Sequence, residues 1–118
     1  MARKKKVVVL VPFAFDENGL SKRRAQQESV ELGPDIEFDY RPVKAGPALY
    51  DSYHDSVLAD MSMFEAGITA QEDGYDAVCI DTMSDSGQNG LRSVLDIPVI
   101  SPGKASYLMC LLLGTNFG

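Results

Sequence analysis

Cysteine and histidine are scarce in this chain of 118 residues, and tryptophan is absent. The two cysteines, Cys79 and Cys110, form no CxxC motif, which excludes a cysteine-rich zinc site and a disulfide scaffold and favours a reducing, cytoplasmic location. The single histidine, His54, is interpreted as a surface or capping residue rather than a catalytic acid. No residues have the spacing of metal ligands, and no glycine-rich nucleotide motif occurs, so we expect neither a metal nor a cofactor.

Positive charge is also in short supply. Eleven Lys and Arg against seventeen Asp and Glu give a formal net charge of −6. Such an acidic surface repels nucleic-acid backbones and anionic membranes, so we expect neither as a partner. No apolar run approaches the ~20 residues that a membrane-spanning helix needs. With 45% hydrophobic and 24% charged residues, residues 1–118 are predicted to form one soluble globular domain.

The basic residues are concentrated at positions 3–6, in front of an apolar run over residues 7–15. This order is also found in signal peptides. Here, however, Pro12 interrupts the run, and the acidic Asp16 and Glu17 follow it in place of a cleavage site. A buried first strand preceded by a solvated basic tail is therefore favoured.

Four segments are predicted to be strands, near residues 6–12, 36–43, 76–81 and 97–101. The first and third are continuous apolar runs rich in β-branched residues, which is typical of strands buried on both faces. The second alternates apolar and charged residues, as edge strands do.

Helix-forming segments lie between these strands and after the last one, over residues 20–32, 51–73, 87–95 and 105–113. The strict alternation predicts a three-layer α/β/α fold with right-handed crossovers. We expect a four-stranded parallel sheet in the order 2-1-3-4, as in flavodoxin-like folds.

Details of the helices are predicted as well. Ser21 is the expected N-cap of the first helix, and Gly114 is the expected left-handed cap of the last. Both cysteines are interpreted as buried core thiols. The residues expected to face the core are Val57, Leu58, Met61, Phe64 and Ile68 in the second helix, and Leu91, Val94 and Leu95 in the third.

Ligands of open α/β sheets bind beyond the carboxyl ends of the strands. The third of these ends, residues 81–87 (DTMSDSG), carries the most chemistry, and Pro12 and Phe13 follow the first strand. Hydroxyls and backbone N–H groups at the start of a helix attract anions, so this loop is a candidate anion site. Alternatively, one serine caps the next helix and an aspartate stabilises its dipole. The candidate binding residues are Pro12, Phe13, Asp81, Thr82, Ser84, Asp85, Ser86 and Gly87.

A collinear series of motifs resembles the aspartate/glutamate/hydantoin racemase superfamily. They are residues 9–12 of the first strand, Gly46-Pro47, Glu65-Ala66-Gly67, DGYDAVCIDTMSDSG from Asp73, and LRSVLDIPVISPGKASYLMCLLLG ending at Gly114. The resemblance covers nearly the whole chain. It implies that residues 1–118 match one of the two similar α/β domains of these enzymes, the N-terminal half.

The resemblance implies a racemase-type isomerase that moves a proton at the α-carbon of a small carboxylate-bearing substrate without a cofactor. Each domain of such enzymes contributes one cysteine, and Thr82 stands at that position here, which makes Thr82 the residue assigned to the catalytic position. Phe13-Ala14 likewise replace the family's polar Asn-Thr. Because a threonine hydroxyl is a poor base, Thr82, Ser84 and Ser86 are expected to donate hydrogen bonds to a carboxylate or enolate oxygen. Alone, the chain is expected to be a half-enzyme or an inactive fragment.

A receiver-like signalling domain, with Asp81 as phosphoacceptor, is the alternative. It has a similar length and strand order, but it needs an acidic pair after the first strand to hold Mg²⁺, and Phe13 and Ala14 occupy that place. A fifth strand ending in Lys-Pro is also missing.

Two segments contain more apolar residues than one small sheet readily covers. These are residues 60–64, which are rich in methionine, and residues 108–113. Apolar surface of this kind is usually buried by association, which predicts a C2 homodimer or a missing second domain. The alternative is that both segments fill the core of the monomer.

Overall fold

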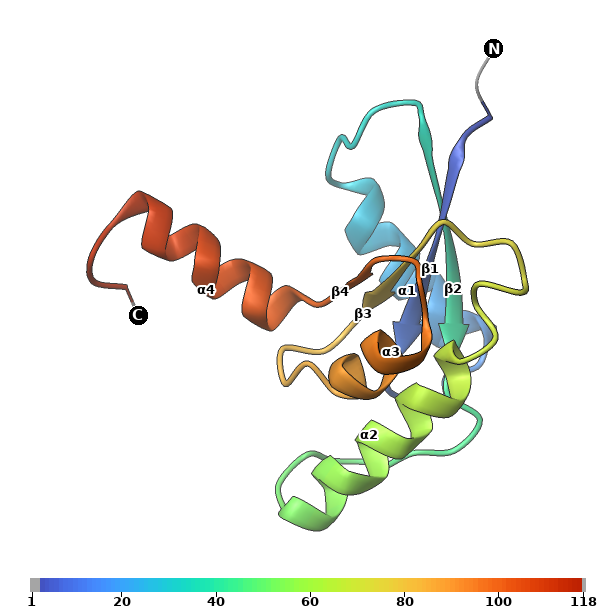
Figure 1. Ribbon diagram of the computed structural model, residues 1–118. Helices are drawn as coiled ribbons and strands as arrows, with labels where there is room; N and C mark the ends of the chain where they lie inside the picture. The colour runs from blue at the N-terminus through green and yellow to red at the C-terminus, as the bar shows by residue number, and fades with distance from the viewer. Residues whose placement is uncertain (1–2, 118) are drawn as a thin grey trace.

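The computed structural model describes residues 3–117 as a parallel β-sheet with helices on both faces (Figure 1). The strand order is β2-β1-β3-β4, and all three strand pairs are parallel, which confirms the predicted fold. In chain order the elements are β1 (Lys5–Val11), α1 (Glu17–Glu28), β2 (Ile36–Pro42), α2 (Tyr53–Gly67), β3 (Ala77–Ile80), α3 (Gln88–Val94), β4 (Val99–Ile100) and α4 (Pro102–Leu113).

One face of the sheet is closed by α2 and α3. The buried side chains of β1, β3 and β4 alternate along each strand and meet Met63 and Ala66 of α2 and Leu91 of α3. This alternation follows from the period of two along a strand. The sheet residues of this core are Val8, Leu10, Val78, Ile80 and Val99, which are at most 3% exposed.

The buried face of α2 differs from the predicted one. Val57 and Met61 are 60% and 67% exposed, and the helix instead packs through Ala59, Met63 and Ala66. Small side chains are favoured there because they let the helix backbone approach the sheet closely. Leu58 and Ile68, also assigned to the core by the sequence pattern, are 37% and 42% exposed, whereas Phe64 packs against the core as predicted.

Several helix ends and faces also differ from expectation. Asp16, not Ser21, caps α1 by accepting the Gly19 N–H at 2.9 Å. Gly114 follows α4 in an extended conformation rather than a left-handed one. Val94 is 53% exposed, and α2 ends at Gly67, well before residue 73. Short capping contacts decide where these helices begin and end.

The other face of the sheet is only partly covered. The helix α1 lies on this side and packs on β2, at one edge. The last helix, α4, does not return to the sheet but projects away from the body (Figure 1). Neither cysteine is fully buried: Cys79 lies on this open face and Cys110 on the projecting helix, so the prediction of two core thiols is wrong. None of the helices among residues 3–117 is long and apolar enough to cross a membrane.

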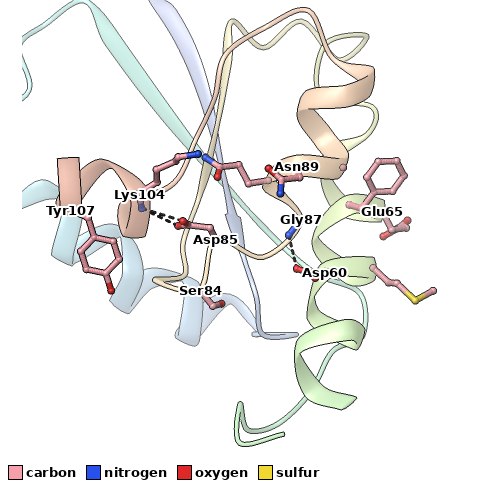
Figure 2. Close-up of a pocket in the computed structure, with 12 residues that line it drawn as sticks. Asp60, Glu65, Ser84, Asp85, Gly87, Asn89, Lys104 and Tyr107 are labelled. Carbon is pink, nitrogen blue, oxygen red and sulfur yellow. Dashed lines mark hydrogen bonds between the residues drawn. The ribbon is translucent and has the colours of Figure 1, made fainter. Parts of the chain in front are cut away.

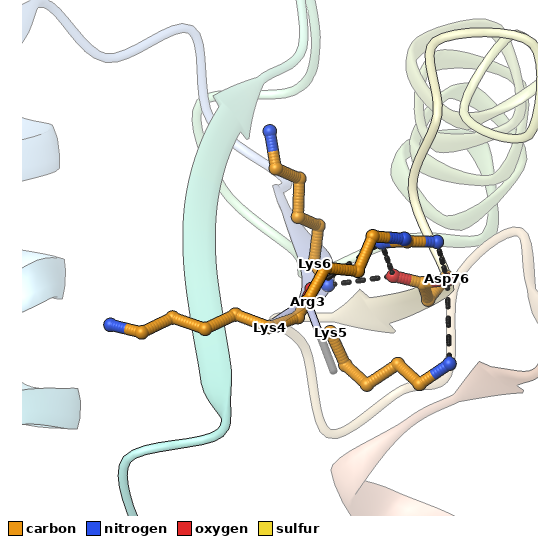
Figure 3. A network of polar contacts seen from close by, with 5 residues as sticks. All are labelled: Arg3, Lys4, Lys5, Lys6 and Asp76. Atoms are coloured by element: carbon orange, nitrogen blue, oxygen red, sulfur yellow. Dashed lines mark hydrogen bonds and ion pairs between the residues drawn. The ribbon is translucent and has the colours of Figure 1, made fainter. Parts of the chain in front are cut away.

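The basic segment before β1 is tied to the start of β3 (Figure 3). Two guanidinium nitrogens of Arg3 donate to Asp76 at 2.7 Å, and the Lys6 backbone N–H donates to the same carboxylate at 2.9 Å. Arg3, followed by this backbone contact, lowers the pKa of Asp76 to about 2. The tail is thus held by an ion pair rather than simply solvated.

The close approach of α2 to the core predicts that Gly67→Ala destabilises the fold. A Cβ at this position would lie 2.7 Å from a Leu10 methyl and 2.9 Å from the methyls of Leu91. Both leucines are fully buried, so neither can move into free space. Overpacking of this kind costs about 1–3 kcal/mol, measured by urea denaturation. The matched variant Gly114→Ala, whose nearest neighbour would be 3.8 Å away, should leave the unfolding midpoint unchanged. Equal midpoints for the two variants would contradict the packing described.

The lowered pKa of Asp76 predicts a specific acid sensitivity. A carboxyl whose pKa is depressed in the folded state stabilises the protein above its unfolded value, near pH 4, and that stabilisation is lost as the pH falls toward about 2. Between these limits the urea midpoint of Asp76→Asn should therefore fall less steeply than that of the unmodified chain. Glu31→Gln, in the exposed loop after α1, is the control and should keep the original slope.

Candidate functional site

The loop that follows β3 presents a row of three hydroxyls. The Thr82 Oγ1 and Ser84 Oγ atoms are 2.7 Å apart, and the Ser84 and Ser86 Oγ atoms are 2.9 Å apart. Ser84 is exposed, whereas Ser86 is only 3% exposed, so the row runs from the surface into the protein. Because each hydroxyl can donate or accept, the row can reorient its protons toward a bound oxygen. The structure thus brings together the three hydroxyls that the sequence singled out.

Gly87 anchors the far end of this loop against α2. Its backbone is left-handed, with φ of 78°, and a Cβ would lie 3.0 Å from that of Met63. Its N–H donates to a carboxylate oxygen of Asp60 at 2.9 Å. Only glycine fits this combination of positive φ and close contact without strain. The glycine therefore fixes the loop between α2 and the first turn of α3.

Asp85 anchors the loop to α4. Its carboxylate accepts hydrogen bonds from the Ser101 hydroxyl and from the Lys104 N–H, the latter at 3.1 Å. A carboxylate at this place satisfies free N–H groups and complements the helix dipole. The sequence suggested that Asp85 stabilises the helix that directly follows it, α3. It caps α4 instead, because the chain returns through β4 to the same edge of the sheet.

Asp81 turns to the opposite face. Its carboxylate lies 3.5 Å from Nε of Arg23 on α1. Burial raises the pKa of Asp81, and the charge of Arg23 acts in the opposite direction. Asp81 is thus half-buried and ion-paired on the side of the sheet away from the hydroxyl row. This arrangement does not favour the receiver-like alternative, in which the aspartate must face an open, metal-holding cleft.

The end of β1 contributes an aromatic cluster. Pro12 is buried, and the Phe13 ring packs against Phe15 at 5.3 Å and against Tyr50 at 5.9 Å between centroids. Burial raises the pKa of Tyr50, and the hydroxyl of Ser86 beside it has the opposite effect. The cluster therefore forms an apolar wall behind the inner end of the hydroxyl row.

A cleft of about 830 Å³ opens beside the loop, between α2, α3 and the first turns of α4 (Figure 2). Of the predicted site residues, Ser84, Asp85 and Gly87 line it, and Thr82 and Ser86 are connected to it through Ser84. Its other lining residues are Asp60, Met61, Phe64 and Glu65 of α2, Gln88, Asn89 and Gly90 of α3, and Lys104 and Tyr107 of α4.

The acidic groups of the cleft are already engaged. Asp60 accepts the Gly87 N–H, Asp85 caps α4, and Glu65 forms an ion pair with Lys44 at 2.9 Å. Lys104, in contrast, has no ion-pair partner among residues 3–117. The ammonium group of Lys104 is thus free to bind an anion.

Gln88 is a second free donor. The residue is 4% exposed, yet its side-chain nitrogen has no hydrogen-bond acceptor in the described part of the chain. Buried donors of this kind are normally satisfied by a water molecule or a ligand. Sequence reasoning missed both Gln88 and Lys104. The only signal was their position, since each stands in the first turn of a helix that starts at the carboxyl edge of the sheet.

Among residues 3–117, neither the cysteines nor the histidine reaches the hydroxyl row. Cys79 lies inside β3 on the open face, where burial and then the charge of Asp81 raise the pKa of its thiol. His54 is exposed near the start of α2, with Nδ1 3.4 Å from Asp55. Among residues 3–117, no three His, Cys, Asp or Glu side chains are grouped as metal ligands. The site is therefore suited to binding an anion rather than to removing a proton from a substrate.

Comparisons with known proteins give one family and one fold. The model of the Asp/Glu/Hydantoin racemase family matches residues 20–118. Allantoin racemase from Klebsiella pneumoniae is similar in structure, with a TM-score of 0.78 and 21% identity over 92% of this chain and 44% of that chain. Allantoin racemase from Pseudomonas fluorescens has a TM-score of 0.79 and 20% identity over 95% of this chain and 46% of that one. No curated protein matches the sequence. The chain spans less than half the length of these solved structures.

The cap on α4 predicts the effect of Asp85→Ala. Loss of a capping carboxylate costs about 0.5–2 kcal/mol of stability. It should also speed hydrogen exchange at the Lys104 amide, because that N–H loses its acceptor. Glu31→Ala, which removes an exposed acid far from any helix start, should change neither quantity. Unaltered exchange at Lys104 in Asp85→Ala would show that the cap does not hold α4.

Proposed function

The chain belongs to the Asp/Glu/hydantoin racemase family, and we propose that it forms the N-terminal half of a racemase-type site. In this proposal the half-site binds a small substrate that carries a carboxylate, and a proton is removed and returned at the neighbouring carbon. The reaction needs no cofactor, because the substrate's own carbonyl or carboxylate group takes up the negative charge.

The observation that carries this proposal is the row of hydroxyls at the carboxyl end of β3. The hydroxyl oxygen of Ser84 lies 2.7 Å from that of Thr82 and 2.9 Å from that of Ser86. Preorganised donors of this type stabilise an oxygen on which negative charge develops, and they are effective because they need not rearrange during the reaction. Lys104 and Gln88 supply further donors in the adjoining cleft.

These donors divide into two groups by depth and charge. The exposed ammonium group of Lys104 suits the permanent charge of a substrate carboxylate, which it attracts over several ångströms. The neutral hydroxyl row suits an oxygen that becomes an enolate only in the transition state, since neutral donors are less favourable to a fixed charge than a cation is. Binding through both groups would orient the substrate's Cα–H bond toward the open side of the cleft.

The half-site lacks a base of its own. A threonine hydroxyl does not ionise near neutral pH, and the Cys79 thiol lies on the far side of β3. We therefore propose that the acid–base groups come from outside this chain. A second domain would supply them. A C2 homodimer that places two loops of residues 81–87 across one cleft would bring together two hydroxyl rows and still no base. By itself the chain is expected to bind carboxylates and to turn them over slowly or not at all.

We place this activity in the cytoplasm. Both cysteines of the chain are unpaired and partly accessible, a state that persists in a reducing compartment.

Carboxylate binding should be visible by NMR. Titration with a small dicarboxylate such as malonate should shift the amide signals of Thr82, Ser84 and Ser86. Ser84→Ala, which interrupts the row, should weaken binding about 10-fold or more, since hydrogen bonds to charged groups contribute about 1.5–3 kcal/mol. Ser93→Ala, on the exposed side of α3, is the matched control and should bind like the original chain. Shifts confined to other loops would contradict the proposed site.

Thr82→Cys tests the acid–base assignment. The substitution places a thiol at the edge of the hydroxyl row, where a fraction of thiolate is available near neutral pH. Exchange of the α-proton for deuterium in a panel of amino acids, hydantoins and dicarboxylic acids should appear in this variant and not in Thr82→Ser, which keeps a hydroxyl. Exchange by the unmodified chain at the rate of Thr82→Cys would show that the chain already holds a base.

A further inference from the structure

The direction of the protons along the hydroxyl row decides whether the row can bind an anion. Between Thr82 and Ser84, and between Ser84 and Ser86, either oxygen can be the donor. The row binds an anionic oxygen only when each hydroxyl donates toward the surface, because the opposite order presents lone pairs to the anion. The group at the buried end of the row therefore matters for the site.

Thr82, at the outer end of the row, is arranged to donate to a ligand. Its Oγ1 accepts the backbone N–H of Ser84 at 3.3 Å and lies 2.7 Å from the Ser84 hydroxyl. When both groups donate to Thr82, both lone pairs of its oxygen are in use and its own proton is left for a ligand. This order requires Ser86 to donate to Ser84, and it requires a further donor that holds Ser86 in that orientation.

Tyr50 lies where this further donor is needed. Its phenol oxygen is buried and has no hydrogen-bond partner within residues 3–117, and the Ser86 hydroxyl is beside it. Ser86 is only 3% exposed, so solvent does not compete for its hydroxyl. Buried hydroxyls are normally paired. The phenol of Tyr50 and the inner end of the row thus supply the partner that each of them lacks.

The loop that carries Tyr50 is fixed at both ends. At its start, the Val43 N–H donates to a carbonyl of β1 at 3.0 Å, and a Cβ on Gly46 would lie 3.0 Å from the Pro12 carbonyl oxygen. At its end, Ser52 caps α2. The Tyr50 ring itself packs edge-on against an aromatic ring of the β1 end, with centroids 5.9 Å apart. The phenol is therefore held in place from three sides.

A phenol is a better hydrogen-bond donor than an alcohol. It ionises at about pH 10, whereas serine and threonine hydroxyls do not ionise in the range of protein side chains. Burial, together with the negative charge of Asp60, raises the pKa of Tyr50, against the opposite effect of the Ser86 hydroxyl. Tyr50 therefore stays protonated near neutral pH and is available as a donor.

We propose that Tyr50 is a positioning residue that sets the direction of the hydroxyl row. Tyr50 donates to Ser86, Ser86 donates to Ser84, and Ser84 donates to Thr82, whose proton then points to the ligand oxygen. No proton is transferred along the row. Aligned hydrogen bonds polarise one another by about 10–30% per bond, so the row binds an anionic oxygen more strongly than three independent hydroxyls do. The inference rests on the proposed function, because the anion is the proposed substrate.

The first test removes only the phenol oxygen. Tyr50→Phe keeps the ring against Phe13, and it should weaken malonate binding about 3- to 10-fold, which is the effect of losing one ordinary hydrogen bond. Tyr75→Phe is the matched control, because its phenol donates to Asp39 at 2.9 Å, outside the site, and its loss should leave the affinity unchanged. An unchanged affinity of Tyr50→Phe, or an equal loss in both variants, would overturn the inference.

The second test distinguishes action through the row from action through packing. Ser84→Ala interrupts the row between Tyr50 and the ligand, so adding Tyr50→Phe to it should cause no further loss of affinity. A side chain that acts by packing alone would reduce the affinity by the same factor in both backgrounds. That result would contradict the proposed role of Tyr50.

A spectroscopic signature should follow the same path. Saturating malonate should shift the NMR signal of the Tyr50 Cζ carbon, because the anion polarises the phenol O–H through the aligned row. The shift should be absent in Ser84→Ala at equal saturation, and its persistence there would overturn the inference. Normal malonate binding by Ser84→Ala would overturn the proposed function itself. Weakened binding by Ser84→Ala beside unchanged binding by Tyr50→Phe would overturn only the role of Tyr50.

Discussion

The close packing of α2 against the sheet is the constraint on which the rest of the molecule depends. Ala59, Ala66 and Gly67 leave little side chain between the helix and the strands, so the large residues Leu10, Met63 and Leu91 fill the space beside them. The same closeness continues at the end of the sheet, where Gly87 touches Met63 and donates to Asp60. One face of the sheet is thereby complete, and the position of the loop over residues 81–87 follows from it.

That loop is fixed to α2 at one end and to α4 at the other, and a carboxylate forms each contact. Asp60 binds it to α2, and Asp85 binds it to α4. A site whose acids are engaged in this way retains hydroxyls, an amide and an ammonium group as its available chemistry. Such a set favours recognition of anionic oxygens and leaves proton transfer to carbon without a base. The available donors thus suit the proposed carboxylate substrate, and the missing base is the reason for proposing a half-site.

Two features of this half-site are incomplete: the set of groups needed for proton transfer and the helical layer on one face of the sheet. The chain spans less than half of the allantoin racemase structures, and within residues 3–117 no Cys or His lies at the hydroxyl row and no helix packs over β3 and β4 on the α1 side. The helix α4 lies next to the site, because the Lys104 N–H in its first turn donates to Asp85 of the loop, and its remaining turns are apolar and exposed.

The sequence by itself determined the order of elements, the parallel sheet and the loop that carries the site. Continuous β-branched runs, alternating residues in the edge strand and the hydroxyl-rich segment after β3 are local patterns, and each has a local physical cause. The sequence also located Thr82, Ser84 and Ser86, which the structure brings into one row.

Only the tertiary structure decided which faces are buried and what the polar groups do. The apolar stripe of α2 at Val57 and Met61 faces outward, because small residues allowed a closer approach on another side of the helix. Asp85 caps a helix that starts seventeen residues later, and Asp81 pairs with Arg23 across the opposite face. These pairings depend on which strands lie side by side. Contacts between residues far apart in the chain leave no periodic signal in the sequence, so the direction of α4 and the free donors of the cleft follow from the fold alone.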